Sequence, residues 1–229
     1  MRIGGLKQRI GGNSKVGCVL DIDFKKIGQG HGQSFMDRSV YGHLCTNYGA
    51  VWNLDGRYFD GSDDYLDLGD KELFRPDAKS MTFDVLFKTE KTVADQGLFT
   101  KGDVYFDGRG AYFLQITASS NTLWRATYQS DFFTAQSSEV IGKLTEAVML
   151  ADHERDKISL AKNGNLFAPD ASNITETANT QNDALLLGCY FYDNARQVYF
   201  KGCFQRVRFY NFADYTARIL ARSIDSRRN

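Results

Sequence analysis

The feature that most constrains this chain is a succession of short apolar segments bounded by Gly, Asn or Asp. They lie at 16–24, 65–68, 81–87, 97–101, 111–117, 122–128, 157–161, 166–168, 184–188 and 198–210. Within the first, residues 20–24 read Leu-Asp-Ile-Asp-Phe, the period-two alternation of a half-buried strand. Many short strands at such spacing indicate an all-β sandwich or barrel.

The turns are expected to come from Gly and Asn, because the chain has 21 glycines and only two prolines. Asn163-Gly164 predicts a tight hairpin, since both residues tolerate positive φ. Only 214–224 has a helical pattern, which predicts a short C-terminal helix. No Pro- or Ser-rich linker divides the chain, so we predict a single domain over 17–224.

Charge is balanced overall but not along the chain. The 28 basic and 28 acidic side chains give zero net charge, which argues against a nucleic-acid binder. Residues 1–16 nevertheless carry Arg2, Lys7, Arg9 and Lys15 and no acid, and 225–229 form a basic tail. We expect 1–16 to be a flexible arm, either a loose terminus or a segment whose cations dock on an acidic partner.

The ends and the cysteines bear on the compartment. No apolar run is long enough to span a membrane, and the N-terminus lacks the apolar region of a secretory signal, so we expect synthesis in a cytoplasm without export. Cys18, Cys45, Cys189 and Cys203 lack zinc-site spacing. Buried free thiols are expected, with Cys18 and Cys203 the one pair that could be joined.

A family resemblance rests on an ordered set of motifs. Residues 59–69, FDGSDDYLDLG, resemble the FDGxDDYVxL signature of laminin-G-like, concanavalin A-like jelly rolls. Residues 37–43, 81–88, 97–103, 162–168 and 200–211 resemble further blocks of that family in the same order. The resemblance implies a two-sheet antiparallel jelly roll with adjacent first and last strands. The chain departs from the family in lacking its Trp-His-His and in having Gln205-Arg206 where Asp-Glu is usual.

The last of these blocks has a two-sided pattern. Arg206 and Arg208 share one side of a strand, and Val207 and Phe209 share the other. We therefore expect the apolar side to pack in the core and the arginine side to meet solvent.

The sequence does not favour catalysis. Glycosidases of related folds place their carboxylates in an ExDxE strand, and this chain has no such run. The acidic residues that come nearest to this pattern are expected to be solvated: Asp21, Asp23, Asp63, Asp64, Glu154 and Asp156. His31, His43 and His153 are scattered without metal-ligand spacing, so we predict a protein that is not an enzyme and requires no cofactor.

Calcium is the ion that this composition would suit, because it takes six to eight oxygen ligands. The candidate ligands are the loop carboxylates Asp60, Asp63, Asp64 and Asp103, with Asp67 nearby. The alternative is that the signature block supplies turn chemistry and holds no ion.

Sugar binding needs aromatic faces beside fixed polar groups. Two stretches expected to be loops, 128–133 and 190–197, combine them. The predicted ligand residues are Tyr128, Asp131, Phe132, Tyr192 and Asn194. Core packing and contact with protein neighbours are alternatives for the same aromatics.

Three functions compete at this stage. The leading expectation is a virion component, such as a phage capsid decoration or a tail or fibre protein, that contacts capsid or tail proteins or copies of itself, and surface glycans. It rests on the missing export signal and the absent catalytic pattern. The alternative is a secreted or cell-surface lectin-like module, and a glycoside hydrolase is disfavoured.

Overall fold

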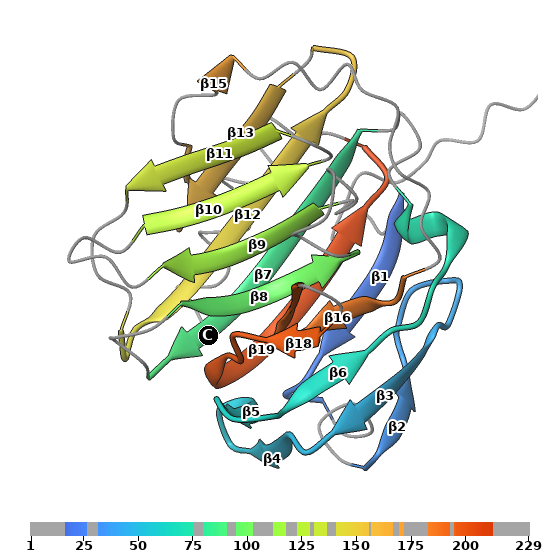
Figure 1. Ribbon diagram of the computed structural model, residues 1–229. Helices are drawn as coiled ribbons and strands as arrows, with labels where there is room; N and C mark the ends of the chain where they lie inside the picture. The colour runs from blue at the N-terminus through green and yellow to red at the C-terminus, as the bar shows by residue number, and fades with distance from the viewer. Residues whose placement is uncertain are drawn as a thin grey trace, which may run out of the picture.

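The protein is described from a computed structural model, shown in Figure 1. The structure describes residues 17–26, 32–75, 80–90, 95–102, 112–117, 123–128, 131–136, 141–155, 157–166, 170–171, 183–192 and 195–212. Of these, 123–128, 131–136, 166, 170–171 and 191–192 are described by their backbone alone. The predicted arm 1–16, the helix 214–224 and the tail 225–229 lie outside the described residues.

Two antiparallel β-sheets pack face to face, as the all-β jelly-roll prediction requires (Figure 1). The larger has the order β14-β13-β12-β7-β19-β5-β4, with β1 also paired to β19 and β15 to β13. Its strands are β1 (Cys18–Asp23), β4 (Val51–Asn53), β5 (Gly56–Asp60), β7 (Met81–Thr89), β12 (Leu144–Asp152), β13 (Lys157–Lys162), β14 (Asn165–Leu166), β15 (Asp170–Ala171) and β19 (Lys201–Tyr210).

The second sheet has the order β11-β10-β9-β8-β16-β6-β3-β2. Its strands are β2 (Ser34–Met36), β3 (Leu44–Tyr48), β6 (Tyr65–Asp67), β8 (Gln96–Lys101), β9 (Tyr112–Thr117), β10 (Leu123–Tyr128), β11 (Asp131–Gln136) and β16 (Leu185–Leu187). A short 3₁₀ helix, η1 (Glu72–Phe74), and a separate hairpin, β17 (Tyr190–Tyr192) with β18 (Ala195–Gln197), complete the described elements.

Two local predictions are confirmed. The first and last described strands are neighbours, with Leu20 opposite Phe209 and Ile22 opposite Val207. The turn between β13 and β14 is Asn163-Gly164, with φ of 49° and 80°. Both residues therefore occupy the left-handed region that the sequence pair was expected to tolerate.

The core lies between the sheets and is rich in aromatic rings. Phe83 of β7 lies 4.6 Å from Phe209 of β19 and 4.4 Å from Tyr112 of β9, measured between ring centroids. Phe99 of β8 stacks on Phe83 at 5.1 Å. All four rings are closed from solvent, and such contacts stabilise the fold beyond simple area burial by about 0.5–1.5 kcal/mol per pair.

The outer side of the larger sheet differs from expectation. Arg206 and Arg208 do share one side of β19, but they are largely buried and paired with acids. Arg208 Nε donates to Oδ1 of Asp21 at 2.9 Å, and Asp21 is only 1% exposed. The expectations that the arginine side meets solvent and that Asp21 is solvated are wrong, because ion pairing compensates the charges for leaving water.

All four cysteines are free and buried, as expected. Burial raises the pKa of Cys189 to about 12, so this thiol stays protonated and unreactive at neutral pH. Cys18 lies opposite Tyr210, whereas Cys203 lies near the other end of β19, so the two are not positioned to pair. Within the described residues, no helix has the length and apolarity that a membrane crossing requires.

Candidate functional site

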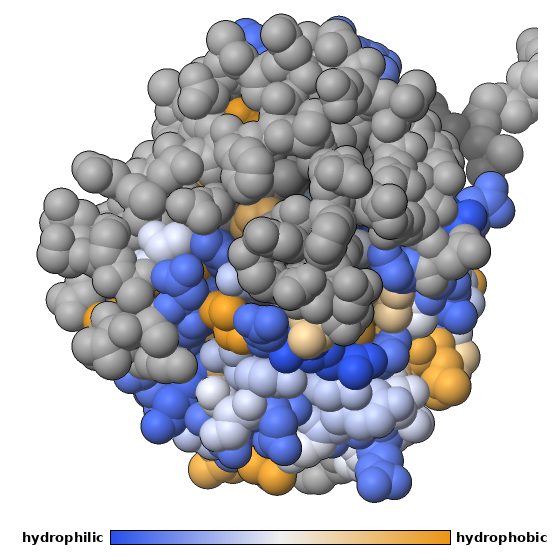
Figure 2. All heavy atoms as spheres, in the orientation of Figure 1, coloured by the Kyte–Doolittle hydropathy of each residue, from blue (hydrophilic) through white to orange (hydrophobic). Residues whose placement is uncertain are grey.

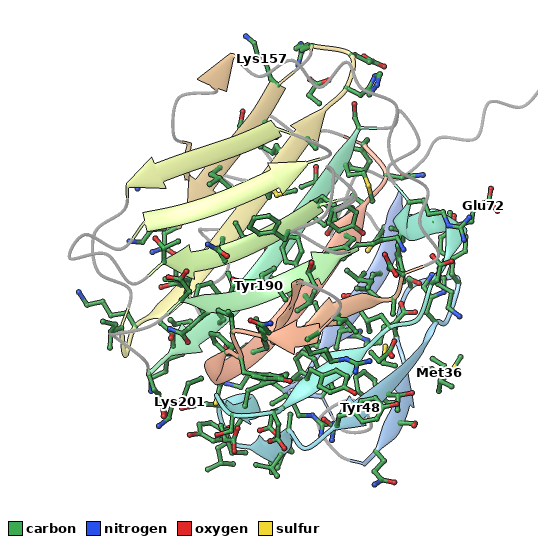
Figure 3. All side chains as sticks on the ribbon, in the orientation of Figure 1. Met36, Tyr48, Glu72, Lys157, Tyr190 and Lys201 are labelled. Carbon is green, nitrogen blue, oxygen red and sulfur yellow. The ribbon has the colours of Figure 1, made fainter. Side chains whose placement is uncertain are left out.

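Two adjoining hollows form a groove at one corner of the sandwich, where β3 and β6 of the smaller sheet lie near β4 and β5 of the larger one. Their volumes are about 550 Å³ and about 480 Å³. Gln33, Asn47 and Gly49 line both, so the hollows share a border. We call this feature the corner groove. Figure 3 labels Tyr48 at the lower end of β3, on its wall.

The first hollow is walled by aromatic rings and one cation. Tyr48 of β3 lies directly opposite Tyr65 of β6, and their rings stack with centroids 4.5 Å apart and planes 11° from parallel. The guanidinium of Arg196, on β18, lies over the Tyr65 ring at 4.5 Å. Tyr199 completes the wall. The sheet register and the hairpin thus assemble a stack in which Tyr65 lies between Arg196 and Tyr48, and the outer ring face of the exposed Tyr48 is the aromatic surface that the hollow presents beside hydrogen-bond donors.

The second hollow is bounded by an indole ring and a buried arginine. Trp52 of β4 is 36% exposed, and its Nε1 donates to the carbonyl oxygen of Phe24 at 3.1 Å, which holds the ring in place. Arg57 of β5 is buried and donates to the carbonyl oxygens of Ala50 at 2.9 Å and Gly32 at 3.3 Å. Burial lowers the pKa of the Arg57 guanidinium, and these carbonyls partly replace its lost water.

An acidic cluster borders the first hollow. Asp60, Asp63 and Asp64 bring one carboxylate oxygen each to within 4.8 Å of one another, and Asp63 also lines the hollow. Asp64 is buried, so the expectation that it is solvated is wrong. Its Oδ2 accepts from the backbone N–H of Asp60 at 2.8 Å. Burial raises the pKa of Asp64, and the charges of Asp60 and Asp63 add to the rise.

The cluster has the chemistry of a calcium site, since it supplies three of the six to eight oxygens that the ion takes. Asp67 lies on β6 and accepts from the backbone N–H of Gly69. Asp103, the fourth predicted ligand, lies outside the described residues. Three of the four predicted ligands therefore come together, which makes the calcium prediction testable.

The predicted sugar-binding residues lie elsewhere. Tyr128 ends β10 and pairs with Asp131, which begins β11 together with Phe132. Their segment is therefore a strand hairpin, not a loop, and it stands at the opposite end of the sheet from β3. Nothing is described of these side chains.

The second predicted stretch is also a hairpin. Tyr192 ends β17 and pairs with Ala195, and Asn194 lies outside the described residues. The contribution of this hairpin to the corner groove is Arg196, a residue that the prediction passed over. Residues 46–53, TNYGAVWN, were also missed, although they place Tyr and Trp beside Asn and Gly.

The predicted docking residues Arg2, Lys7, Arg9 and Lys15 lie outside the described residues.

Two carboxylates on neighbouring strands bear on catalysis. Asp84 of β7 is 0% exposed and Glu146 of β12 is 2% exposed, and both lie on the outer side of the larger sheet. One guanidinium nitrogen of Arg206 contacts Asp84 at 3.3 Å and Glu146 at 2.8 Å. These acids are engaged in a buried ion pair, whereas a glycosidase needs its two carboxylates free on either side of a sugar bond.

The end of the β2–β3 pair that lies away from the corner groove carries exposed apolar side chains. The exposed residues Met36, Val40, Tyr41 and Leu44 form what we call the edge patch, on β2, β3 and the connection between them. Orange atoms mark a hydrophobic area at the right margin of Figure 2, where Figure 3 labels Met36. Because β2 is the edge strand of its sheet, the patch lies at an open side of the sandwich.

Comparisons with known proteins agree with this architecture. The family model for the concanavalin A-like lectin/glucanase superfamily, Laminin_G_3, matches residues 60–219. No curated protein matches the sequence. A solved structure of the Ruminococcus gnavus IT-sialidase CBM40 bound to α2,3-sialyllactose is similar with a TM-score of 0.56 and 16% identity, over 77% of this chain and 97% of that one.

Two further structures extend the comparison. Domain 4 of AbnA, an extracellular GH43 arabinanase of Geobacillus stearothermophilus, in complex with arabinotriose, is similar with a TM-score of 0.66 and 14% identity, over 89% of this chain and 97% of that one. A Trypanosoma rangeli sialidase mutant with trans-sialidase activity has a TM-score of 0.69 and 13% identity, over 90% of this chain. The match spans only 32% of that sialidase. At these identities the likeness concerns the fold.

Proposed function

The chain belongs to the concanavalin A-like lectin/glucanase superfamily, and we propose that it is a carbohydrate-binding module without catalytic activity, with the corner groove as its site. The observation that carries the proposal is the stacked pair Tyr48 and Tyr65 with Arg196 over it. Sugar rings present flat apolar faces and a rim of hydroxyls, so they suit an aromatic wall next to fixed donors and acceptors.

Structures with a similar fold support this proposal, because they contain bound sugars. The Ruminococcus gnavus CBM40 is bound to sialyllactose and the AbnA domain to arabinotriose. The absence of enzymatic activity is proposed on a separate ground, namely that Asp84 and Glu146 are held by Arg206 and closed from solvent. Incubation with sialyllactose and with arabinan, followed by analysis for released sugars, tests this part; release of product would refute it.

A glycan array tests the binding. We expect the wild-type chain to bind a defined subset of glycans and Tyr48→Ala to lose at least about tenfold in affinity, since a stacking contact is removed. Tyr41→Ala is the matched control, because Tyr41 is 49% exposed, close to the 45% of Tyr48, but lies on the edge patch. An array on which the wild type binds nothing, or on which both variants lose equally, would count against the proposal.

Contact with protein neighbours is a second candidate, and the edge patch favours it. Met36 and Leu44 lie opposite each other on β2 and β3 and are both about half exposed. Apolar side chains gathered at an open sheet edge suit burial against another protein. The virion role expected from the sequence is one form of this candidate. Co-sedimentation with assembled virus particles tests this role. The wild-type chain should sediment with the particles, whereas the Leu44→Asp variant should stay in the supernatant.

A further inference from the structure

The corner groove has two aromatic walls rather than one. Tyr48 and Tyr65 stand at the first hollow, and Trp52 stands at the second. Each hollow alone has the volume of a pocket for a small ligand, which is roughly 300–1,000 Å³. One sugar ring can stack on only one of these walls, so a single monosaccharide would leave the other wall unused.

Asn47 lies where the hollows meet, because it lines both. Its side-chain Nδ2 donates to the carbonyl oxygen of Ala50 at 2.9 Å, and its backbone N–H donates to the carbonyl oxygen of Gln33 at 2.6 Å. The Ala50 carbonyl also fixes which way the amide points, since a carbonyl oxygen accepts only from the NH₂ side. Asn47 is thus a rigidly held polar group at the junction.

The oxygen of the Asn47 amide lacks a hydrogen-bond donor within the part of the chain that the structure describes. Oδ1 of Asn47 is buried and has no hydrogen-bond partner among the described residues. A buried acceptor without a donor costs about 1–3 kcal/mol, so a ligand O–H or N–H that displaces the atoms covering Oδ1 meets an acceptor with no competing partner in the described ranges. Sugar hydroxyls are such donors. A hydroxyl next to the linkage between two sugars would reach the junction while the two rings occupy the two hollows.

We infer that the corner groove takes an extended oligosaccharide of at least two sugar units, with one unit on the outer ring face of Tyr48, the next on Trp52, and a hydroxyl between them donating to Oδ1 of Asn47. This inference rests on the proposed function. It makes Asn47 a residue that selects chain length, because only a ligand that crosses the junction meets the acceptor and both walls together. Gln33 and Gly49 also line both hollows.

The experiment uses an array that carries the mono-, di- and trisaccharides of each sugar series, and calorimetry on the series that binds. We expect the di- or trisaccharide to bind at least about tenfold more tightly than its monosaccharide. Trp52→Ala should remove most of that gain, so that it lowers the affinity for the di- or trisaccharide by a larger factor than the affinity for the monosaccharide. Asn47→Leu, which keeps the side-chain size and removes the acceptor, should do the same, and Tyr48→Ala should weaken both ligands.

The outcomes separate the two claims. A chain that binds no member of any series refutes the proposed function, and the inference falls with it. A chain that binds mono- and trisaccharide equally, or whose Trp52→Ala variant keeps the full gain, refutes the inference and leaves the proposed function standing. Because Asn47→Leu removes a hydrogen bond to Ala50, its thermal melt is measured beside it, and the Trp52→Ala result decides if that variant fails to fold.

Discussion

Gly49 lies so close to Asp64 that a Cβ atom on Gly49 would overlap Oδ1 of the Asp64 carboxylate. The backbone of Gly49 has φ of +85°, a conformation that favours glycine. The contact joins the corner groove to the acidic cluster, because Gly49 lines both hollows and Asp64 is the buried member of the cluster. A substitution at either residue should therefore disturb the packing of the other.

Replacing Gly49 by alanine should destabilise the fold by about 2–4 kcal/mol, through backbone strain and overlap with Asp64 together. Urea denaturation measures the loss. Gly142→Ala is the matched control, since Gly142 also has positive φ, at +67°, but a Cβ there would meet nothing within 4 Å. The Gly142→Ala variant should lose only about 1–2 kcal/mol of stability, from the strain of a non-glycine residue at positive φ. Equal losses in the two variants would mean that Asp64 moves aside freely.

Asp64→Asn should change how stability depends on pH. Burial raises the pKa of Asp64, so its stabilising contribution is fully present below the unfolded pKa of about 3.9 and is lost as pH rises through the folded pKa. The asparagine keeps an acceptor for the N–H of Asp60 and never ionises. Between about pH 4 and 7 the free energy of unfolding of the variant should therefore rise relative to wild type.

For Asp70→Asn, the stability difference from wild type should change with pH in the opposite direction to that of Asp64→Asn. Although burial opposes it, hydrogen bonds and charge from Arg75 and Lys101 lower the pKa of Asp70. Its contribution is present above the unfolded pKa and is lost as pH falls through the folded pKa, so this variant should lose most at neutral pH and least below about pH 4. Parallel pH profiles for the two variants would contradict both assignments.

Calcium should stabilise the protein through Asp60, Asp63 and Asp64. A cation among three carboxylates relieves the repulsion that helps to raise the pKa of Asp64. For a dissociation constant of about 10⁻⁴–10⁻³ M, about 10 mM calcium adds about 1.4–2.7 kcal/mol, which a thermal melt against chelator detects. Asp63→Asn should reduce the shift, whereas Asp55→Asn, an exposed acid outside the cluster, should keep it. If calcium leaves the melting temperature of the wild type unchanged, the prediction of a calcium site is wrong.

Burial on both sides does not by itself hide a strand, since β7, β8 and β9 are buried almost throughout and were found at 81–87, 97–101 and 111–117. β1 was found because Asp21 and Asp23 interrupt an apolar run. β12 was missed because its residues, LTEAVMLAD, are mostly helix-favouring Leu, Glu, Ala and Met and show no alternation. In β19, a register shift between Phe204 and Arg206 breaks the alternation that the local pattern supplies.

The proposed site and the predicted one lie in different places. Aromatic rings beside amides and acids were sought in 128–133 and 190–197. Tyr48 and Tyr65 come together only through the pairing of β3 with β6, and Arg196 joins them only through the β17–β18 hairpin. Those pairings depend on sheet register, which no local window contains. Asp60, Asp63 and Asp64 are close in sequence, so their proximity could be predicted without knowledge of the sheet register.

The outer side of the larger sheet supplies the last prediction. Arg206 contacts both Asp84 and Glu146. Burial alone would lower the pKa of its guanidinium, but the charges of these two acids raise it above its usual value. Arg206→Met removes the cation that both buried carboxylates share. Removing one partner of a buried ion pair typically costs about 3–5 kcal/mol, and we expect a loss of that size in urea denaturation.

Arg155→Met is the control that separates burial from pairing. Arg155 also pairs with an aspartate, Asp152, at 3.2 Å, but its own side chain is 66% exposed. Asp152 is buried and keeps the N–H groups of Glu154 and Arg155 as donors, so we expect the loss of the exposed cation to cost only about 0–1 kcal/mol. If Arg206→Met costs as little as Arg155→Met, then water reaches Asp84 and Glu146, these carboxylates are available for chemistry, and the proposal that the protein is not an enzyme loses its physical support.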